Sequence, residues 1–484
     1  MPVYHFMREY IFLFCISILS SFANAQDSTL TYSTAISLAA STAQTPFWLR
    51  ANQNGVVPGN GTFGLGQFGL YKNYNTNNPR IFQWSAGAEL IANFGKSGYG
   101  RRSDYFFTDL YAAGKIGPVE ILVGQKKHVT GLMDTTLTSG SLSFSGNARP
   151  IPGFQISIPS FYPLAFTNYF ISVKASFGDG RLGPSNISYG SVPSVPSTYF
   201  HEKSLYFRFG KPSDRIKIFA GINHQARWGG ESEISPVSKL NTINAYWYVI
   251  SGKTFDYRKI GSHFGTIDIA GEWTAKAWTY LLYRQNIYET GSLFKVTNFA
   301  DGLNGIRIRR NKPLMKDQTY FDVNSFLFEV VGTKNQTNNS PLSGLALFDK
   351  GDYYNSYIYS QGLSFKGGEI GTALNPNQDL TDKVLPRNST KFTNNNRIWA
   401  FHSGVKASWL NTDLQFRGTY SRNFGTYINP FNSAVQQFSM QLSASKKMKF
   451  LRNGSFIASF YSDIGSLYPS SSSFVLGYRK IGFL

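Results

Sequence analysis

The sequence is poor in cysteine, in charged residues and in long apolar runs. Its 484 residues contain one cysteine, Cys15, which lies in an N-terminal segment that we expect to be removed. The mature chain would then have no disulfide and no thiol chemistry. Beyond that segment, no apolar run approaches the roughly 20 residues that a membrane-spanning helix needs. The sequence therefore excludes a helical membrane protein.

Residues 1–25 have the pattern of a cleaved signal peptide. Arg8 supplies the positive charge, residues 10–19 are mostly apolar, and Ala23-Asn24-Ala25 form a small-x-small cleavage site. The apolar stretch is too short to remain as a membrane anchor. We therefore predict an exported chain with one folded unit over residues 26–484.

The composition is aromatic without being hydrophobic overall. Phe and Tyr number 41 and 29, only 15% of the residues are charged, and the mean hydropathy is −0.22. A helical membrane protein would be more hydrophobic. A transmembrane β-barrel has this composition, because its lumen and loops contact water and are polar, while aromatic side chains are enriched at the membrane interfaces.

Apolar and polar residues alternate over segments of about ten residues near the C-terminus. One face of the first segment carries Leu414, Phe416, Gly418 and Tyr420. The other face carries Asp413, Gln415, Arg417, Thr419 and Ser421. The pattern recurs at 438–444 and 456–461. Successive side chains of a strand point to opposite faces, so this alternation predicts an all-β protein, an antiparallel transmembrane β-barrel.

Alternation also predicts strands elsewhere along the chain. These strands are expected at 32–38, 84–94, 105–113, 119–124, 169–177, 205–209, 216–226, 246–250, 279–285, 305–309, 321–331, 401–409 and 474–481. Polar stretches at 184–198, 334–341 and 375–396 are predicted as loops. The final strand has its aromatic residue, Phe483, one position before the end of the sequence.

The net charge of +20 predicts an acidic partner. An exported chain rarely meets nucleic acid, so we exclude it as a partner. Acidic polysaccharide and the phosphates of lipopolysaccharide in the outer membrane fit the compartment better.

Three segments resemble the capsule assembly Wzi family. They are residues 46–55 (PFWLRANQNG), 123–127 (VGQKK) and 221–230 (GINHQARWGG). With the barrel pattern, the resemblance extends over nearly the whole mature chain.

The resemblance implies an outer-membrane barrel of about 18 strands. It also implies that an N-terminal segment, outer loops and a few short periplasmic helices plug the lumen. The implied activity is lectin-like: the protein would attach capsular polysaccharide to the cell surface, without a cofactor and without catalysis. We expect a monomer.

Gln225, Arg227 and Trp228 form the first candidate polysaccharide site. Alternation over 216–226 places Gln225 and Arg227 in the lumen, where they could bind hydroxyls or carboxylates, and Trp228 could stack on a sugar ring. The alternative is that Trp228 is an aromatic residue of the membrane interface.

Trp48, Arg50 and Gln53 lie on an irregular segment after the first predicted strand. They could line a sugar path inside the lumen. The alternative, which we favour, is that this segment plugs the barrel and that Trp48 packs there.

Arg307 and Arg309 share one face of a predicted strand. Their guanidinium groups could bind uronic-acid carboxylates in the lumen, or they could contact lipopolysaccharide phosphates at a strand end. Lys126, Lys127 and His128, at another strand end, are interpreted as surface charge.

The sequence offers little for catalysis. It has no G-x-S-x-G elbow and no H-E-x-x-H helix. Glu231 and Glu233 follow His224 closely, as metal ligands can, but they are predicted to lie in a loop. We therefore expect no enzyme, no metal site and no cofactor.

Three functions remain open. The first is attachment of acidic capsular polysaccharide. The second is a porin or channel selective for anions or sugars, which would require an open lumen. The third is a purely structural barrel that serves another secretion or assembly machine.

Overall fold

The structure is a computed structural model. It describes residues 29–59, 61–75, 81–95, 103–236, 240–256, 258–289, 298–312, 321–336, 351–448 and 454–484. The predicted signal peptide and part of the predicted loop 334–341 lie outside these residues.

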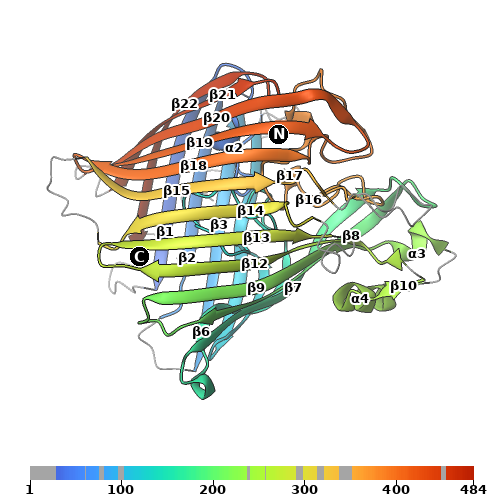
Figure 1. Cartoon of the computed structure of the whole chain (residues 1–484), viewed down its shortest axis with the longest axis horizontal. Helices are drawn as coiled ribbons and strands as arrows, with labels where there is room; N and C mark the ends of the chain where they lie inside the picture. Colours follow the sequence, from blue (N-terminus) through green and yellow to red (C-terminus); the bar gives the residue numbers. More distant parts are fainter. Residues whose placement is uncertain are drawn as a thin grey trace, which may run out of the picture.

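Eighteen antiparallel strands form one sheet that closes into a barrel (Figure 1). The strands are β1 (Leu30–Ser41), β2 (Phe63–Lys72), β3 (Phe82–Gly95), β4 (Ser103–Ile116), β5 (Val119–Gln125), β6 (Gly153–Pro163), β7 (Ile171–Asn186), β8 (Ser194–Phe209), β9 (Ile216–Trp228), β12 (Ser262–Thr274), β13 (Trp278–Tyr288), β14 (Gly302–Arg310), β15 (Asp322–Gly332), β18 (Ile398–Trp409), β19 (Thr412–Gly425), β20 (Pro430–Met448), β21 (Gly454–Gly465) and β22 (Ser471–Phe483). The predicted fold class and strand number are confirmed.

The first and last strands close the barrel. β1 pairs with β22 in a register that runs from Thr31 opposite Phe483 to Ser41 opposite Ser473. Closure leaves no sheet edge, so the backbone groups of every barrel strand can be paired within lipid.

The two faces of the wall differ as the alternation predicts. On the outer face, Leu282 and Ile36 are 64% and 63% exposed. On the inner face, Thr266, Gln285 and Glu329 are fully buried. An apolar outer face suits lipid, and the buried polar inner face requires hydrogen-bond partners inside the lumen.

The two ends of the barrel differ in their connections. At one end, here called the turn end, short connections such as 117–118 and 410–411 join the strands, and both β1 and β22 have their terminal ends there. The opposite end, the loop end, carries the connections 126–152, 187–193 and 333–397.

The small elements cluster at the loop end. They are the helices α2 (Phe47–Arg50), α3 (Glu231–Ile234) and α4 (Thr242–Ser251), the 3-10 turn η3 (Gln378–Leu380), and the hairpins β10 (Thr254–Phe255) with β11 (Arg258–Lys259) and β16 (Ser364–Phe365) with β17 (Gly368–Glu369). Only the 3-10 turn η1 (Ala165–Thr167) lies at the turn end among the described residues. With the short turns in the periplasm, as in outer-membrane barrels, this 3-10 turn is the one periplasmic helical element of the described residues, where the prediction expects a few short helices. No helix in that part is long and apolar enough to cross a membrane.

One predicted strand is wrong, because residues 246–250 belong to α4. The Asn241 side chain accepts a hydrogen bond from the Asn244 N–H at the start of this helix, and Gly252 ends it in the left-handed conformation at φ 65°. These two caps decide the structure of an apolar run whose composition fits a strand equally well.

Three strands, β2, β6 and β12, are not predicted from the sequence, and the predicted loop 184–198 is too long. Gly64, Gly66 and Gly69 remove the alternation from β2, while Pro159 and a register shift between Ile158 and Tyr162 interrupt β6. β12 alternates between the two faces as the predicted strands do, but it is not among them. Strands β7 and β8 extend into the predicted loop 184–198 and leave only 187–193 between them.

Candidate functional site

Three segments fill the lumen toward the loop end. Two of them, residues 45–58 and 126–152, are here called the lumen plug, and the third, residues 351–396, is called the cap loop. Their apolar residues join inward-facing wall residues in one buried cluster, which includes Phe47, Trp48, Leu142, Phe264 and Tyr353. The candidate binding residues have to be judged against this packed interior.

Trp48 lies at the centre of the plug and is fully buried. Its ring lies 4.9 Å from the His402 ring, and the Arg417 guanidinium carbon is 5.1 Å from its centroid. A sugar cannot reach either face of this indole in this arrangement. The placement favours the plug interpretation of Trp48.

Arg50 and Gln53 lie on the same segment. The Arg50 guanidinium carbon is 4.9 Å from the centroid of Tyr468, so it takes part in the packing around α2. The Gln53 carbonyl accepts a hydrogen bond from the Val56 N–H at 3.1 Å. The Phe47 N–H anchors the segment to the wall by donating to Asp463 Oδ2 at 2.8 Å.

Glu329 of β15 is the main anchor for residues 126–152. Its Oε1 accepts from Thr138 Oγ1 at 2.6 Å, and its Oε2 accepts from the Ser139 N–H at 2.7 Å and the Ser139 hydroxyl at 2.6 Å. The Tyr283 hydroxyl of β13 also donates to Oε1. One buried carboxylate thus receives four donors and ties the plug to the wall.

Gln225 and Arg227 point into the lumen, as predicted, and both are buried. Gln225 Nε2 donates to the Ser143 carbonyl of the plug at 2.8 Å. Arg227 donates to the Gly362 carbonyl of the cap loop at 2.9 Å and to Thr198 Oγ1 at 3.1 Å. Both side chains bind the protein's own loops.

Trp228 lies on the outer face of β9, opposite to the lumen. Its ring is 4.9 Å from Tyr199 and 5.4 Å from Tyr246 of α4, and its side chain packs with Ala245 and Val249. The three proposed residues therefore do not form one site, because a side chain one position after Arg227 must face the other way. Helix α4 covers the Trp228 ring.

Arg307 points into the lumen, but its counter-charges come from the protein. Its guanidinium nitrogens lie 3.6 Å from Asp134 of the plug and 3.6 Å from Glu272 of β12. Burial alone would raise the pKa of Asp134, but donors at Leu137 and Thr136 and the charge of Arg307 hold it below its usual value. Arg309 is exposed at the turn end, so a contact with phosphates at the loop end is excluded for this pair.

The interpretation of Lys126, Lys127 and His128 as surface charge is wrong for two of the three. Lys127 Nζ is 2.5 Å from Glu89 and 3.4 Å from Asp109 on the inner wall. His128 Nε2 is 3.1 Å from Glu202, and both line a cavity of about 150 Å³ between β5–β8 and the plug. The chain turns back into the barrel after β5, which alternation cannot reveal.

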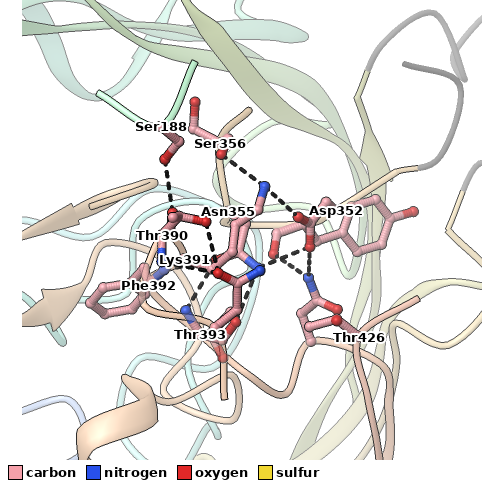
Figure 2. A network of polar contacts seen from close by, with 12 residues as sticks. Ser188, Asp352, Asn355, Ser356, Thr390, Lys391, Phe392, Thr393 and Thr426 are labelled. Carbon is pink, nitrogen blue, oxygen red and sulfur yellow. Dashed lines mark hydrogen bonds and ion pairs between the residues drawn. The ribbon is translucent and has the colours of Figure 1, made fainter. Parts of the chain in front are cut away.

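A dense polar network fixes the cap loop (Figure 2). Asn355 Oδ1 accepts from the N–H groups of Phe392 and Thr393 at 3.1 and 3.0 Å. Lys391 Nζ lies 3.1 Å from Asp352 Oδ2 and 3.0 Å from the Ser356 carbonyl. The network holds two distant parts of the cap loop together.

An aromatic pair that the sequence did not single out lies beside this network. Tyr189, in the connection 187–193, is 54% exposed, and its ring is 4.6 Å from the ring of Tyr357. The neighbouring Ser188 hydroxyl donates to the Thr390 carbonyl at 2.9 Å. Exposed tyrosine among Ser and Thr groups suits sugar binding, because the ring stacks and the hydroxyls pair with sugar hydroxyls.

The described residues contain no group of three or more His, Asp or Glu side chains placed to hold a metal ion. Glu231 Oε1 accepts from the Gly229 N–H at 2.8 Å, whereas His224 lies on the outer face and shares a hydrogen bond with His263 at 2.7 Å. These residues resemble metal ligands only in their spacing along the sequence.

Replacing Glu329 with Ala should detach the plug from the wall. Four donors lose their acceptor, so we expect a loss of about 1–3 kcal/mol in the free energy of unfolding and faster tryptic cleavage between residues 126 and 149. Heat-induced gel-mobility shifts and timed proteolysis measure both effects. Glu233→Ala, at an exposed carboxylate of α3, is the control, and equal behaviour of the two variants would contradict the anchoring role.

The His128–Glu202 contact predicts a pH-dependent plug. Burial lowers the pKa of His128, but the Glu202 carboxylate and the Lys126 carbonyl raise it, and the net result lies above the ordinary 6.5. The contact therefore contributes stability fully below about pH 6.5, and loses it as the pH rises through the folded-state pKa. The difference in melting temperature between the wild type and His128→Gln should be largest at pH 6 and shrink by pH 9. A difference that is constant or grows with pH would argue against this ion pair.

Comparisons with known proteins identify the fold. No protein-family model matches the sequence, and no curated protein matches it either. The structure is similar to Wzi of Escherichia coli, described as an outer membrane protein involved in group 1 capsule assembly and as a carbohydrate-binding β-barrel. The TM-score is 0.58 and the identity is 15%, over 98% of this chain and 88% of that one.

Two other solved structures match at lower similarity. OccAB4 of Acinetobacter baumannii gives a TM-score of 0.48 at 6% identity, over 94% of this chain and 99% of that one. A BenF-like porin of Pseudomonas fluorescens gives 0.47 at 10% identity, over 95% and 100%. The likeness to Wzi that the sequence segments predict is thus confirmed at the level of the fold, which is that of an outer-membrane β-barrel.

Proposed function

We propose that the chain binds capsular polysaccharide at its loop end and attaches it to the cell surface. In this proposal the loop end faces outward, as long loops of outer-membrane barrels do. The ligand contacts the cap loop and the connection 187–193, and does not enter the lumen. The described wall residues that could have bound a ligand inside, such as Arg227 and Glu329, already bind the plug and the cap loop.

This occupied lumen is the observation that carries the proposal. Gln225, Arg227 and Arg307 are each buried and each contact the lumen plug or the cap loop. A channel selective for anions needs free cations along an open path, so the same contacts argue against transport. The likeness in fold to a carbohydrate-binding barrel supports the choice of a glycan as ligand.

The charge of the chain favours an acidic glycan. The net charge is +20, and exposed cations such as Lys366 and Lys383 lie on the cap loop. Carboxylates of uronic acids would pair with them, while Tyr189 would stack on a sugar face.

Replacing Tyr189 with Ala should weaken glycan binding by about tenfold, which corresponds to roughly 1.4 kcal/mol. The measurement is binding of the purified protein to the acidic capsular polysaccharide of the producing cell, by biolayer interferometry at several salt concentrations. Stacking should persist at high salt, whereas the contribution of surface cations should decline.

Phe166→Ala is the matched control, because Phe166 is 86% exposed at the turn end. Unchanged affinity of Tyr189→Ala, or an equal loss in the control, would contradict a site at the cap.

In cells, loss of the protein should release polysaccharide into the medium, and a normal capsule layer without it would contradict the proposed attachment.

A further inference from the structure

A group of cations lies on the outer face of the wall at the loop end. It consists of Lys334, Arg397 and Arg422 around the rings of Phe424 and Tyr427, and is here called the rim patch. Arg422 lies opposite Trp399 in the β18–β19 pair, and Trp399 is two residues from Phe401, which is 44% exposed on the outer face. The patch therefore faces sideways, away from the lumen.

Aromatic rings hold each of these cations in place. The Arg397 guanidinium carbon is 3.8 Å from the centroid of Tyr427, and Lys334 Nζ is 4.4 Å from that of Phe424. Arg422 reaches the same Phe424 ring at 6.0 Å. A guanidinium stacked on a ring keeps its edge N–H groups available for an anion.

The backbone brings the three cations together. The Arg397 N–H donates to the Gly425 carbonyl at 3.1 Å, and Arg397 Nε donates to the Lys334 carbonyl at 3.4 Å. The Tyr427 hydroxyl donates to the Asn335 carbonyl at 2.9 Å. The two ends of the connection 333–397, the end of β19 and the connection 426–429 thus lie together at one place on the rim.

The protein supplies these cations with no carboxylate in the part of the chain that the structure describes. Some arginines elsewhere in the described chain have such partners, as Arg310 does in Asp322 at 3.0 Å and Arg149 does in Asp104 at 2.7 Å. Within the described residues, no ion pair joins Lys334, Arg397 or Arg422 to an Asp or Glu. Three clustered cations without a counter-charge favour an external anion.

The surroundings indicate the level of the membrane interface. Below the patch, the outer face carries exposed apolar side chains such as Phe401 and Phe438. At the same end, α4 packs on the outer face of β9 and presents Trp247 and Ile243, 63% and 71% exposed. Tryptophan and tyrosine gather where a membrane protein meets the headgroups.

We propose that the rim patch binds a phosphate group of a lipid in the outer leaflet. The patch continues the lipid-facing wall and does not rise from the cap loop, so the anion nearest to it is a lipid headgroup and not a soluble glycan. Bound there, the lipid fixes the depth of the barrel, and it leaves the cap loop free for the polysaccharide.

The test is lipid binding by the purified full-length chain in detergent, followed by native mass spectrometry. The probes are bis-phosphorylated lipid A, its dephosphorylated form and inorganic phosphate. Arg397→Gln/Arg422→Gln should weaken binding of bis-phosphorylated lipid A about 25-fold, at about fivefold for each cation removed. Binding of the dephosphorylated form should not change.

The control is Lys383→Gln/Arg387→Gln, which removes two charges from the cap loop at the same end of the barrel. Heat-induced gel-mobility shifts show whether each variant is folded. If the double variant does not fold, Arg422→Gln alone, at an exposed position, replaces it in the lipid-binding measurement. The proposal is overturned if the cap variant loses lipid binding as strongly as the rim variant. It is also overturned if the rim variant loses affinity for acidic polysaccharide while it still binds lipid A.

Discussion

The structure depends on hydrogen bonding between the inner wall and the segments that fill the lumen. A barrel of this kind turns one residue in two toward its interior, and many of those residues here are polar and buried. Each such group needs a partner. Residues 137–142 of the plug supply hydrogen-bond partners to three wall residues. Glu329 accepts hydrogen bonds from Thr138 and Ser139. The His402 ring is hydrogen-bonded to the Leu137 carbonyl at 2.7 Å, and Gln285 Oε1 accepts from the Leu142 N–H at 2.9 Å. The wall and the plug therefore stabilise each other, because the buried polar groups of each need hydrogen-bond partners from the other.

This dependence argues against a binding site inside the lumen. In the sequence, inward-facing arginines and glutamines are candidates for ligand binding in the lumen. Here Arg227, Gln225 and Arg307 hold the cap loop and the plug, so a ligand has to be bound by surfaces that these segments expose. The two proposed sites then have separate tasks: the cap meets a soluble glycan above the membrane, and the rim patch meets lipid headgroups beside it.

The sequence predicts the wall far better than the site. Alternation depends only on which side of a strand meets lipid, so it identifies β19 or β22 directly and places Gln225 and Arg227 correctly in the lumen. It fails where that rule does not apply. Gly64, Gly66 and Gly69 hide β2, and the apolar residues 246–250 form a helix because Asn241 and Gly252 cap it.

The course of the loops follows from contacts between residues far apart in the chain. No local pattern shows that residues after β5 return into the barrel, where Lys127 meets Glu89. Local patterns also do not show that Tyr189 contacts Tyr357, which is 168 positions later in the chain. They do not show that Lys334 and Arg422 both lie near the ring of Phe424. Binding residues on such loops become visible only when the fold is known.

The claim that the lumen is filled can be tested most directly by conductance. The purified chain would be inserted into planar lipid bilayers and the current recorded over a range of voltages and salt concentrations. A sealed barrel predicts insertion without a sustained current, since a plug that fills the lumen would leave no continuous water path across it. A steady, anion-selective conductance per inserted molecule would contradict the account and make the chain a channel.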